Sequence, residues 1–350
     1  MEKDYILPVP VLNKKEKKAL DVLTNRYKKM IEPSVVSKVS QKAKDIAPPK
    51  IKDTVSSVLS SISENDLYQR ALELASSGFK IVEEQVAKYT INESMIIKEI
   101  NKFDESNKIS KLQEICLFRS YDISRAVNKS KGMSRTYAFV EGGATGAVGF
   151  WGLPFNLVLS TLLYFRAVQT IAMYYGYDVR SDASELIISS EVFINALSPS
   201  KTDINNEMGG IIGKVMLMTQ ASVVRQTAKK TWFDMASKGG IPLLLAQMRA
   251  LANKAAQKAI EKAGEKGLER SIFKSVFEQI GKKLTLKTVG KAVPVASAIL
   301  GGLIDIALMH RVVEFADIFY QKRFILEKES RIDQLLDNDS QVIDVDFIEK

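Results

Sequence analysis

Residues 147–165 read AVGFWGLPFNLVLSTLLYF, a run of 19 residues without a charged side chain. Counted from Gly142, the uncharged stretch is 24 residues long. A membrane-spanning helix needs about 20 apolar residues, so the length alone permits a crossing. One proline and three polar residues interrupt the run, namely Pro154, Asn156, Ser160 and Thr161. Burial inside a helical protein explains the same apolarity, and we favour a buried core helix over full spanning or shallow, reversible insertion.

A second apolar segment, residues 292–310, contains Asp305 as its only charged residue in 19. It resembles the first segment faintly, because Gly301 precedes Asp305 by four residues as Gly152 precedes Asn156. This likeness indicates a degenerate internal duplication. Small residues recur in both segments at spacings of three and four, which lets helices approach closely. They are Gly142, Gly146, Gly149 and Gly152 in the first segment, and Ala298 and Gly302 in the second. We expect the two segments to pack together as a central pair of helices.

Almost every other segment has the periodicity of an amphipathic helix. The apolar residues of 109–123, for example, fall on one stripe. Thr90 with Glu93, and Asp182 with Glu185, have the spacing of capping boxes at helix starts. No stretch shows the sustained period-two alternation of a half-buried strand. The sequence therefore predicts an all-α protein, a multi-helix bundle built around the two apolar, glycine-rich helices.

Composition divides the chain into three regions. Residues 1–60 hold 13 basic and 7 acidic residues and include a lysine-rich amphipathic helix, KKEKKALDVLTNRYKKMI. We expect this helix to dock on the main body, and a linker with Pro48 and Pro49 to follow it. Residues 61–330 form the main helical domain. Residues 331–350 form an acidic C-terminal tail.

One cysteine and one histidine in 350 residues restrict the available chemistry. Cys116 cannot form an internal disulfide, and the first residues lack the apolar core of a secretory signal, so we expect a cytoplasmic protein. A zinc site cannot reach its usual set of Cys and His ligands, and no metal is expected. We interpret Cys116 as a core residue and His310 as a buried or interfacial residue with one hydrogen bond.

The glycines of residues 141–156, EGGATGAVGFWGLPFN, do not fit a phosphate-binding loop. A Walker A loop requires a lysine directly after its last glycine. No lysine occurs between residues 132 and 200. The Gly-x-Gly-x-x-Gly pattern is missing as well, and no strand precedes the glycines. We therefore expect no nucleotide and no other cofactor.

Basic residues are concentrated between residues 229 and 291, with 14 lysines and arginines against 5 acidic residues. Lys254, Lys258 and Lys262 recur every fourth residue and form a ridge on one face of a helix. The opposite face carries apolar residues, namely Met248, Leu251 and Ala255. A basic amphipathic helix of this kind is typical of binding to anionic lipid. We predict membrane contact through the ridge and three further lysines, Lys282, Lys283 and Lys287. The charge would also suit nucleic acid, but no nucleic-acid-binding motif accompanies it.

Three separated motifs occur in a fixed order: VEGGATGAVGFWGLPFNL at 140–157, YYGYD at 174–178, and IGKKLTLKTVGKAVPVASAILGGLIDIALMHRVVEFADIFYQKRF at 280–324. Through these motifs the chain resembles the EcsC protein family from about residue 65 to residue 330. The resemblance implies a bacterial, mostly helical, membrane-associated protein without an established reaction. The family takes its name from a protein encoded beside an ABC transporter. Asn156 stands where many relatives have an acid, which argues against a mechanism that needs a carboxylate there.

Carboxylates are the only catalytic groups that remain. Glu141, Asp178 and Asp305 flank or enter the apolar segments, as do Glu185 and Asp317, and desolvation there raises a carboxyl pKa. A buried acid pair could catalyse hydrolysis or bind a divalent cation. We favour structural roles, because paired buried carboxylates are common without catalysis. The expected roles are helix caps or ion pairs with Arg166, Arg180, Arg311 or Lys291.

The sequence thus favours a non-catalytic protein at the cytoplasmic face of the membrane, peripheral or shallowly inserted through its basic amphipathic region. Two alternatives stay open. One is a carboxylate-dependent hydrolase that acts on a lipid or envelope substrate, with Glu141, Asp178 or Asp305 as the catalytic group. The other is an accessory partner of a transporter or defence system.

Overall fold

The computed structural model describes residues 5–31, 64–87, 92–105, 107–131, 153–197, 207–219, 240–289 and 297–346. All regular secondary structure in these ranges is helical, which confirms the all-α prediction. The elements are α1 (Lys14–Ile31), α4 (Glu64–Ser76), α5 (Phe79–Ala87), α6 (Glu93–Ile100), η1 (Leu112–Leu117), α8 (Leu153–Tyr174), α9 (Ala183–Leu197), α10 (Glu207–Leu217), α12 (Ile241–Ala263), η4 (Glu265–Gly267), α13 (Leu268–Val289) and α14 (Ser297–Asp346). Residues 120–131 are helical as well.

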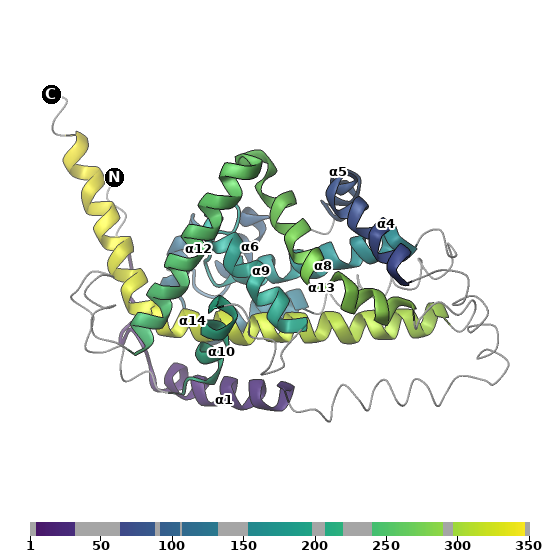
Figure 1. Cartoon of the computed structure of the whole chain (residues 1–350). Helices are drawn as coiled ribbons and strands as arrows, with labels where there is room; N and C mark the ends of the chain where they lie inside the picture. Colours follow the sequence, from purple (N-terminus) through teal and green to yellow (C-terminus); the bar gives the residue numbers. More distant parts are fainter. Residues whose placement is uncertain are drawn as a thin grey trace.

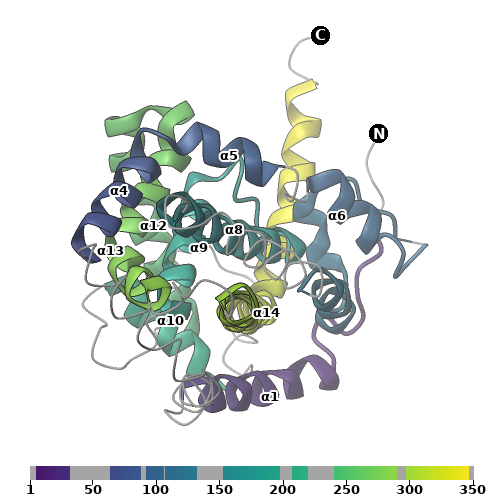
Figure 2. The ribbon, with the colours of Figure 1, turned by 90° about the vertical axis from the view of Figure 1, so that its right-hand side faces the viewer.

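The 50-residue helix α14 runs along the length of the molecule and organises it (Figure 1). Viewed along its axis, α14 lies in the middle, with α8 and α9 above it and α1 below it (Figure 2). All three helices pack directly on α14, and α10 and η1 also contact it. The predicted division of the chain at residue 330 falls inside this helix, because residues 331–346 continue α14.

Helix α8 begins inside the uncharged run 147–165 and contains its residues 153–165. Its residues 154–174 form the one helix among the described residues that is long and apolar enough to cross a membrane. However, 83% of its most apolar window is buried inside the protein. Helices α4, α5, α9, α13 and α14 surround it. The apolarity of this part of the run is therefore accounted for by core packing.

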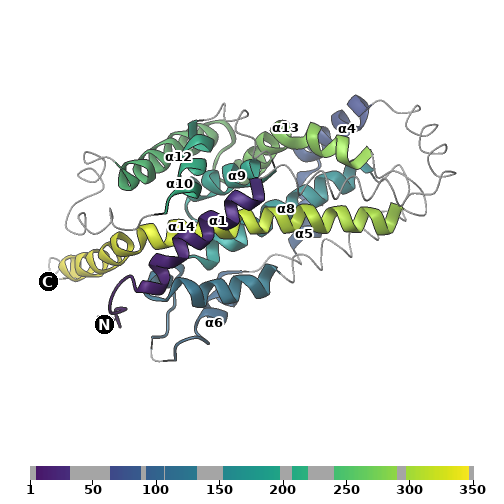
Figure 3. The ribbon, with the colours of Figure 1, turned by 90° about the horizontal axis from the view of Figure 1, so that it is seen from below.

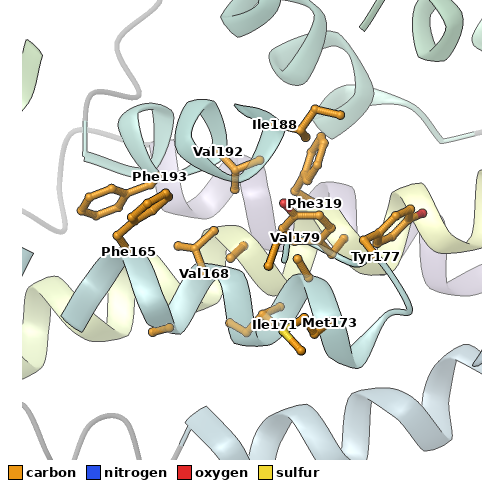
Figure 4. Close-up of a cluster of buried hydrophobic side chains, with 14 of the residues drawn as sticks. Phe165, Val168, Ile171, Met173, Tyr177, Val179, Ile188, Val192, Phe193 and Phe319 are labelled. Carbon is orange, nitrogen blue, oxygen red and sulfur yellow. The ribbon is translucent and has the colours of Figure 1, made fainter. Parts of the chain in front are cut away.

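Aromatic rings from three helices meet at the centre of this core. Phe165 of α8 stacks on Phe193 of α9, with 5.9 Å between ring centroids, and lies 6.4 Å from Phe273 of α13. Figure 4 shows the first two rings facing each other, with Val168 and Val192 beside them. Buried aromatic pairs contribute about 0.5–1.5 kcal/mol beyond the area that they bury, so this cluster ties the three helices together.

Helix α1 docks on α14 as expected, and it crosses that helix when the molecule is seen from below (Figure 3). Its buried face is the apolar stripe of the sequence, with Leu20, Leu23 and Tyr27. Its first turn is fixed by a capping box. The Glu16 amide donates to Asn13 Oδ1 at 2.9 Å, and the Asn13 amide donates to Glu16 Oε2 at 3.2 Å.

Helices α12 and α13 form a hairpin whose turn lies at the top of Figure 1, across α14 from α1, and both helices descend from this turn towards α14. The turn between them contains Gly264 with φ of +66°, a conformation that favours glycine. The Gly264 amide donates to the carbonyl of Ile260 at 2.7 Å and closes the last turn of α12. Helix α12 packs on α9 and α10, and α13 packs on α4, α8 and α9.

The two predicted capping boxes are only partly right. Asp182 caps α9, because its Oδ1 accepts from the amides of Ser184 and Glu185 at 2.8 and 3.3 Å. The Glu185 carboxylate does not complete the box, since it binds an arginine of α14 instead. Helix α6 is capped by Asn92, which accepts from the Met95 amide. Thr90, the predicted cap, lies outside the described residues.

Candidate functional site

The YYGYD motif forms the turn that joins α8 to α9. Gly176 has φ of +79°, and a Cβ placed there would lie 2.6 Å from the carbonyl oxygen of Leu112 and still closer to the Arg331 guanidinium. Arg331 donates to the carbonyls of Tyr175 and Gly176 at 2.8 and 2.9 Å. The turn directly after α8 is thereby tied to α14. The glycine is required by close packing as well as by its backbone conformation.

Asp178, a candidate catalytic carboxylate, has a local structural role in this turn. Its Oδ1 accepts from the amides of Arg180 and Ser181 at 3.0 and 3.1 Å. An aspartate that accepts from amides two and three residues ahead forms an Asx turn. Asp178 therefore stabilises the entry into α9.

Asp317 anchors a buried group of charges on α14 that we call the Asp317 cluster. Lys131 Nζ donates to its Oδ2 at 2.8 Å, and Arg26 Nη2 does so at 3.1 Å. The hydroxyl of Tyr175 donates to its Oδ1 at 2.7 Å. Glu314, one turn earlier, also binds both cations, at 3.1 Å from Lys131 and 2.5 Å from Arg26. Burial opposes ionisation of Glu314, but Lys131 and Arg26 outweigh it and lower the pKa of that carboxyl.

A second buried group, the Arg323 cluster, lies two turns further along α14. Arg323 donates to both oxygens of Glu185 at 2.6 Å and to Glu327 at 3.2 Å. The Tyr177 hydroxyl donates to Glu327 at 2.8 Å, and the Arg323 guanidinium lies over the Tyr177 ring. Burial opposes ionisation of Glu327, but Arg323 and two further arginines outweigh it and lower its pKa. Arg249 of α12 lies 3.6 Å from Glu185 at the edge of the group.

A third group, the Glu16 cluster, joins α1 to the far part of α14. Lys328 Nζ donates to Glu16 Oε1 at 2.9 Å and to the carbonyl of Phe118 at 2.7 Å. Arg119 and the Ser120 amide also donate to the Glu16 carboxylate, at 3.1 and 3.0 Å. Burial raises the pKa of Glu16, but Lys328 and the backbone amides lower it by more than burial raises it. The net shift of this pKa is therefore downward.

These clusters give the buried carboxylates a structural function. A general acid needs a raised pKa, so that it holds its proton near neutral pH. Glu16, Glu314 and Glu327 have lowered pKa values instead, because a cation faces each of them. Glu185 and Asp317 lie in ion pairs, as the structural interpretation of the sequence expects, but with partners other than those predicted. Arg166 pairs with Glu83 and Glu269, and Arg311 donates to the carbonyl of Ala196.

Lys322 is buried in a different environment, at the junction of α1, α10 and α14. Its ammonium donates to Thr24 Oγ1 at 2.5 Å and to the carbonyls of Met216 and Met218 at 2.7 and 2.6 Å. The two carbonyls belong to the C-terminal end of α10, where a cation is favourable. Desolvation nevertheless lowers the pKa of Lys322 to about 7. Lys322 therefore joins three helices while changing its charge near neutral pH.

The predicted basic ridge lies on the outer face of α12. Lys254, Lys258 and Lys262 are all exposed. The inner face is formed by Met248, Ala252 and Ala256, which are buried, with Leu251 and Ala255 half-buried beside them. Three more exposed cations follow on η4 and α13, namely Lys266, Arg270 and Lys274. Acidic residues alternate with this second set, including the exposed Glu265 and Glu278, whereas α12 itself carries one exposed acid, Glu261. The ridge on α12 is thus the more strongly basic part of the hairpin.

Several predicted site residues, or their side chains, lie outside the part of the chain that the structure describes. Glu141 and the glycines Gly142, Gly146, Gly149 and Gly152 lie outside the described residues. Ala298, Gly302 and Asp305 are in helix α14, and Lys282, Lys283 and Lys287 are in helix α13, but their side chains are not among those described. The pairing of α8 with α14 is observed, whereas close contact through these small residues stays a prediction.

The single cysteine and histidine differ in their positions. Cys116 is fully buried in the core, as predicted, and burial raises the pKa of its thiol. His310 is exposed on α14, so the prediction that it is buried is wrong, whereas an interfacial position with one hydrogen bond stays a prediction. Within that part, no group of three or more His, Cys, Asp and Glu residues is arranged to hold a metal ion.

A comparison with protein-family models agrees with the resemblance that the three sequence motifs indicate. The model of the EcsC protein family matches residues 11–325, so this chain belongs to the EcsC family. The match begins before α1, whereas the resemblance based on the motifs began only at about residue 65. It therefore includes both Glu16 and Asp317, the α1 and α14 sides of buried clusters. Searches of curated proteins and of solved structures gave no significant match.

Proposed function

We propose that this EcsC-family protein is a non-catalytic, peripheral membrane protein that binds the anionic cytoplasmic face of the bilayer through α12. The observation that carries the proposal is the row of exposed lysines Lys254, Lys258 and Lys262, opposite a face that is buried against α9 and α10. Because the inner face is already packed, the helix presents its charge to a surface without opening the core. Each lysine near an anionic membrane contributes about 1 kcal/mol, so three give about 3 kcal/mol.

Peripheral contact fits the structure better than insertion of the apolar run. The described part of that run is α8, which is enclosed by other helices. Its exposure to lipid would require the central aromatic cluster of Phe165, Phe193 and Phe273 to separate. An electrostatic contact has no such cost. Binding of this kind weakens with salt, because salt screens charges between exposed groups.

Vesicle flotation tests the proposal. The full chain is expected to float with vesicles of phosphatidylglycerol and phosphatidylcholine, to stay behind with phosphatidylcholine alone, and to be released by high salt. Binding that ignores both lipid charge and salt would overturn it.

Energy transfer tests the role of α12 itself. A donor dye on Gln257→Cys, which lies among the ridge lysines, should transfer to acceptor-labelled anionic vesicles. Replacement of Lys254, Lys258 and Lys262 by glutamine should remove the transfer. The matched control replaces three exposed lysines elsewhere, Lys80, Lys98 and Lys108, and should leave the transfer unchanged. Equal transfer from the ridge variant and the control would exclude α12 as the binding face.

The hydrolase alternative now depends on residues other than Asp178. That carboxylate is engaged with the backbone of its own turn. Glu141 and Asp305 are the remaining candidates, and Glu141→Gln should abolish function without changing thermal stability or vesicle binding if they act in catalysis. A partnership with a transporter or defence component is a further proposal, which a pull-down from the native host would examine.

A further inference from the structure

Helix α1 carries a second basic surface, which we call the α1 face. Its exposed charged residues are five lysines and one aspartate, namely Lys14, Lys15, Lys18, Lys28, Lys29 and Asp21. Lys15 also lies over the ring of Tyr121, with 3.7 Å from Nζ to the ring centroid. The other acidic residue of the helix, Glu16, is buried and paired with Lys328. The α1 face is therefore more uniformly basic than the outer face of α12 with its continuation on α13.

The orientation of the α1 face is fixed by buried contacts along the whole helix. Glu16 pairs with Lys328 near its start, and Arg26 pairs with Asp317 and Glu314 near its end. Between them, the hydroxyl of Thr24 accepts from Lys322. These contacts hold one side of α1 against α14, so the lysines on the other side point away from the body.

The α1 face and the α12 ridge lie on different sides of the protein. In Figure 1, α1 is at the bottom and the turn between α12 and α13 is at the top, with α14 between them. Figure 2 shows the same separation when α14 is viewed end-on. A flat bilayer placed against α1 would therefore lie across α14 from the α12–α13 turn, where the ridge ends at Lys262. Both surfaces are built alike, as a helix with a buried inner side and exposed lysines outside.

We propose that the α1 face binds a second anionic bilayer, so that one molecule bridges two membrane surfaces. The inference rests on the proposed function, since it assigns the other surface to α12. The exposed lysines form one group near the start of α1 and another near its end, and lysines at a helix surface can bind a layer of phosphate headgroups without a shaped pocket. Val22, which is 52% exposed among these lysines, adds an apolar contact at the headgroup boundary.

Vesicle aggregation measures bridging separately from binding. Anionic vesicles labelled with donor dye are mixed with anionic vesicles labelled with acceptor dye, and protein is added at low salt. The wild-type chain is expected to increase both turbidity and energy transfer between vesicles, and high salt should reverse both. Flotation of the same samples reports binding.

Two single-surface variants identify the origin of aggregation. One replaces Lys14, Lys18, Lys28 and Lys29 by glutamine, and the other replaces Lys254, Lys258 and Lys262. Each should still float with anionic vesicles through its intact surface, while aggregation falls to the level of vesicles without protein. A control with Lys80, Lys98, Lys108 and Lys111 replaced should aggregate vesicles like the wild type. All of these side chains are exposed, and circular dichroism verifies that the variants remain folded.

Each other outcome has a separate meaning. If the wild type floats without aggregating vesicles, bridging is wrong and the proposed function stands. If either single-surface variant still aggregates vesicles, association between copies of the protein joins them, and the α1 face is not a second membrane site. If the wild type does not float with anionic vesicles, both proposals fail.

Discussion

Arg323 donates two hydrogen bonds of 2.6 Å to the carboxylate of Glu185, which lies 138 residues earlier in the chain. The side chain of Arg323 is fully buried, and that of Glu185 is 4% exposed. A bidentate pair of this geometry is strong because both guanidinium donors match both carboxylate oxygens. The pair joins α9 to α14, and the fixed spacing of the two donors restricts how the helices can pack on each other.

Removal of one partner from this pair should be costly. Glu185→Gln leaves Arg323 buried with Glu327 as its remaining carboxylate, and breaking a buried pair costs about 3–5 kcal/mol. We expect a loss of that size in the free energy of unfolding, measured with urea. The control Glu84→Gln changes an exposed acid of α5 and should alter stability by less than about 0.5 kcal/mol. Equal stability of the two variants would show that the Glu185 pair contributes nothing.

Stability should rise with pH through Lys322. Its pKa is about 7 in the folded protein, whereas an exposed lysine titrates near 10.4. Between these values the unfolded chain binds more protons, so folding becomes more favourable as pH increases, by up to about 1.4 kcal/mol per pH unit. Below about pH 7 both states are protonated and the effect ends.

The variant Lys322→Met isolates this dependence. The unfolding free energies of wild type and variant are compared at several pH values from 6 to 9. Their difference should change in favour of the wild type as the pH rises above about 7. Asp21 and Lys28, which face Lys322 from α1, remain in both proteins. A difference that stays constant over this range would contradict the lowered pKa.

Two glycines with positive φ should respond differently to alanine. At Gly176 a Cβ meets the Leu112 carbonyl at 2.6 Å, whereas at Gly264 no atom lies within 4 Å among the described residues. Gly264 has φ of +66° and ψ of 166°, a region that is almost restricted to glycine, so Gly264→Ala should cost about 1–3 kcal/mol for its backbone conformation. Gly176→Ala adds a steric clash with Arg331 and the Leu112 carbonyl, and its loss in stability should clearly exceed that of Gly264→Ala. Similar thermal midpoints for the two variants would argue against close packing at the YYGYD turn.

Cys116 should react with thiol reagents only when the protein opens. Its side chain is fully buried and its thiol pKa is raised, so the reactive thiolate is scarce and inaccessible. We expect labelling in native buffer to be at least about 1000-fold slower than in urea, since opening costs several kcal/mol. Rapid native labelling would place Cys116 in a part of the core that opens easily.

The periodicity of the sequence was sufficient to predict the all-helical fold and the inner faces of α1 and α12. The α1 stripe around Leu20 and Leu23 is buried, and the α12 lysines are exposed. These features depend on spacing within one helix, which local sequence contains. The burial of α8 was predicted because a proline and three polar residues interrupt its apolar run.

The buried ion pairs could not be predicted in the same way. Partners such as Glu16 and Lys328 are separated by 312 residues, and spacing within a helix says nothing about such contacts. A signal was present in residues 314–331, where charged residues occur on all sides of a helix that also carries large apolar residues throughout. A helix of that composition at the centre of a protein must pair its charges internally.

The position of these pairs along α14 has a consequence for shortening the chain. The family match ends at residue 325, yet Glu327, Lys328 and Arg331 lie beyond it. A protein that stops at residue 325 would leave the hydroxyl of Tyr177 without its acceptor, the carboxylate of Glu16 without its lysine, and the carbonyls of the turn after α8 without their guanidinium. A shortened version that keeps these contacts therefore extends at least to Arg331, and one that reaches Leu335 also keeps the buried side chain on the next turn of α14.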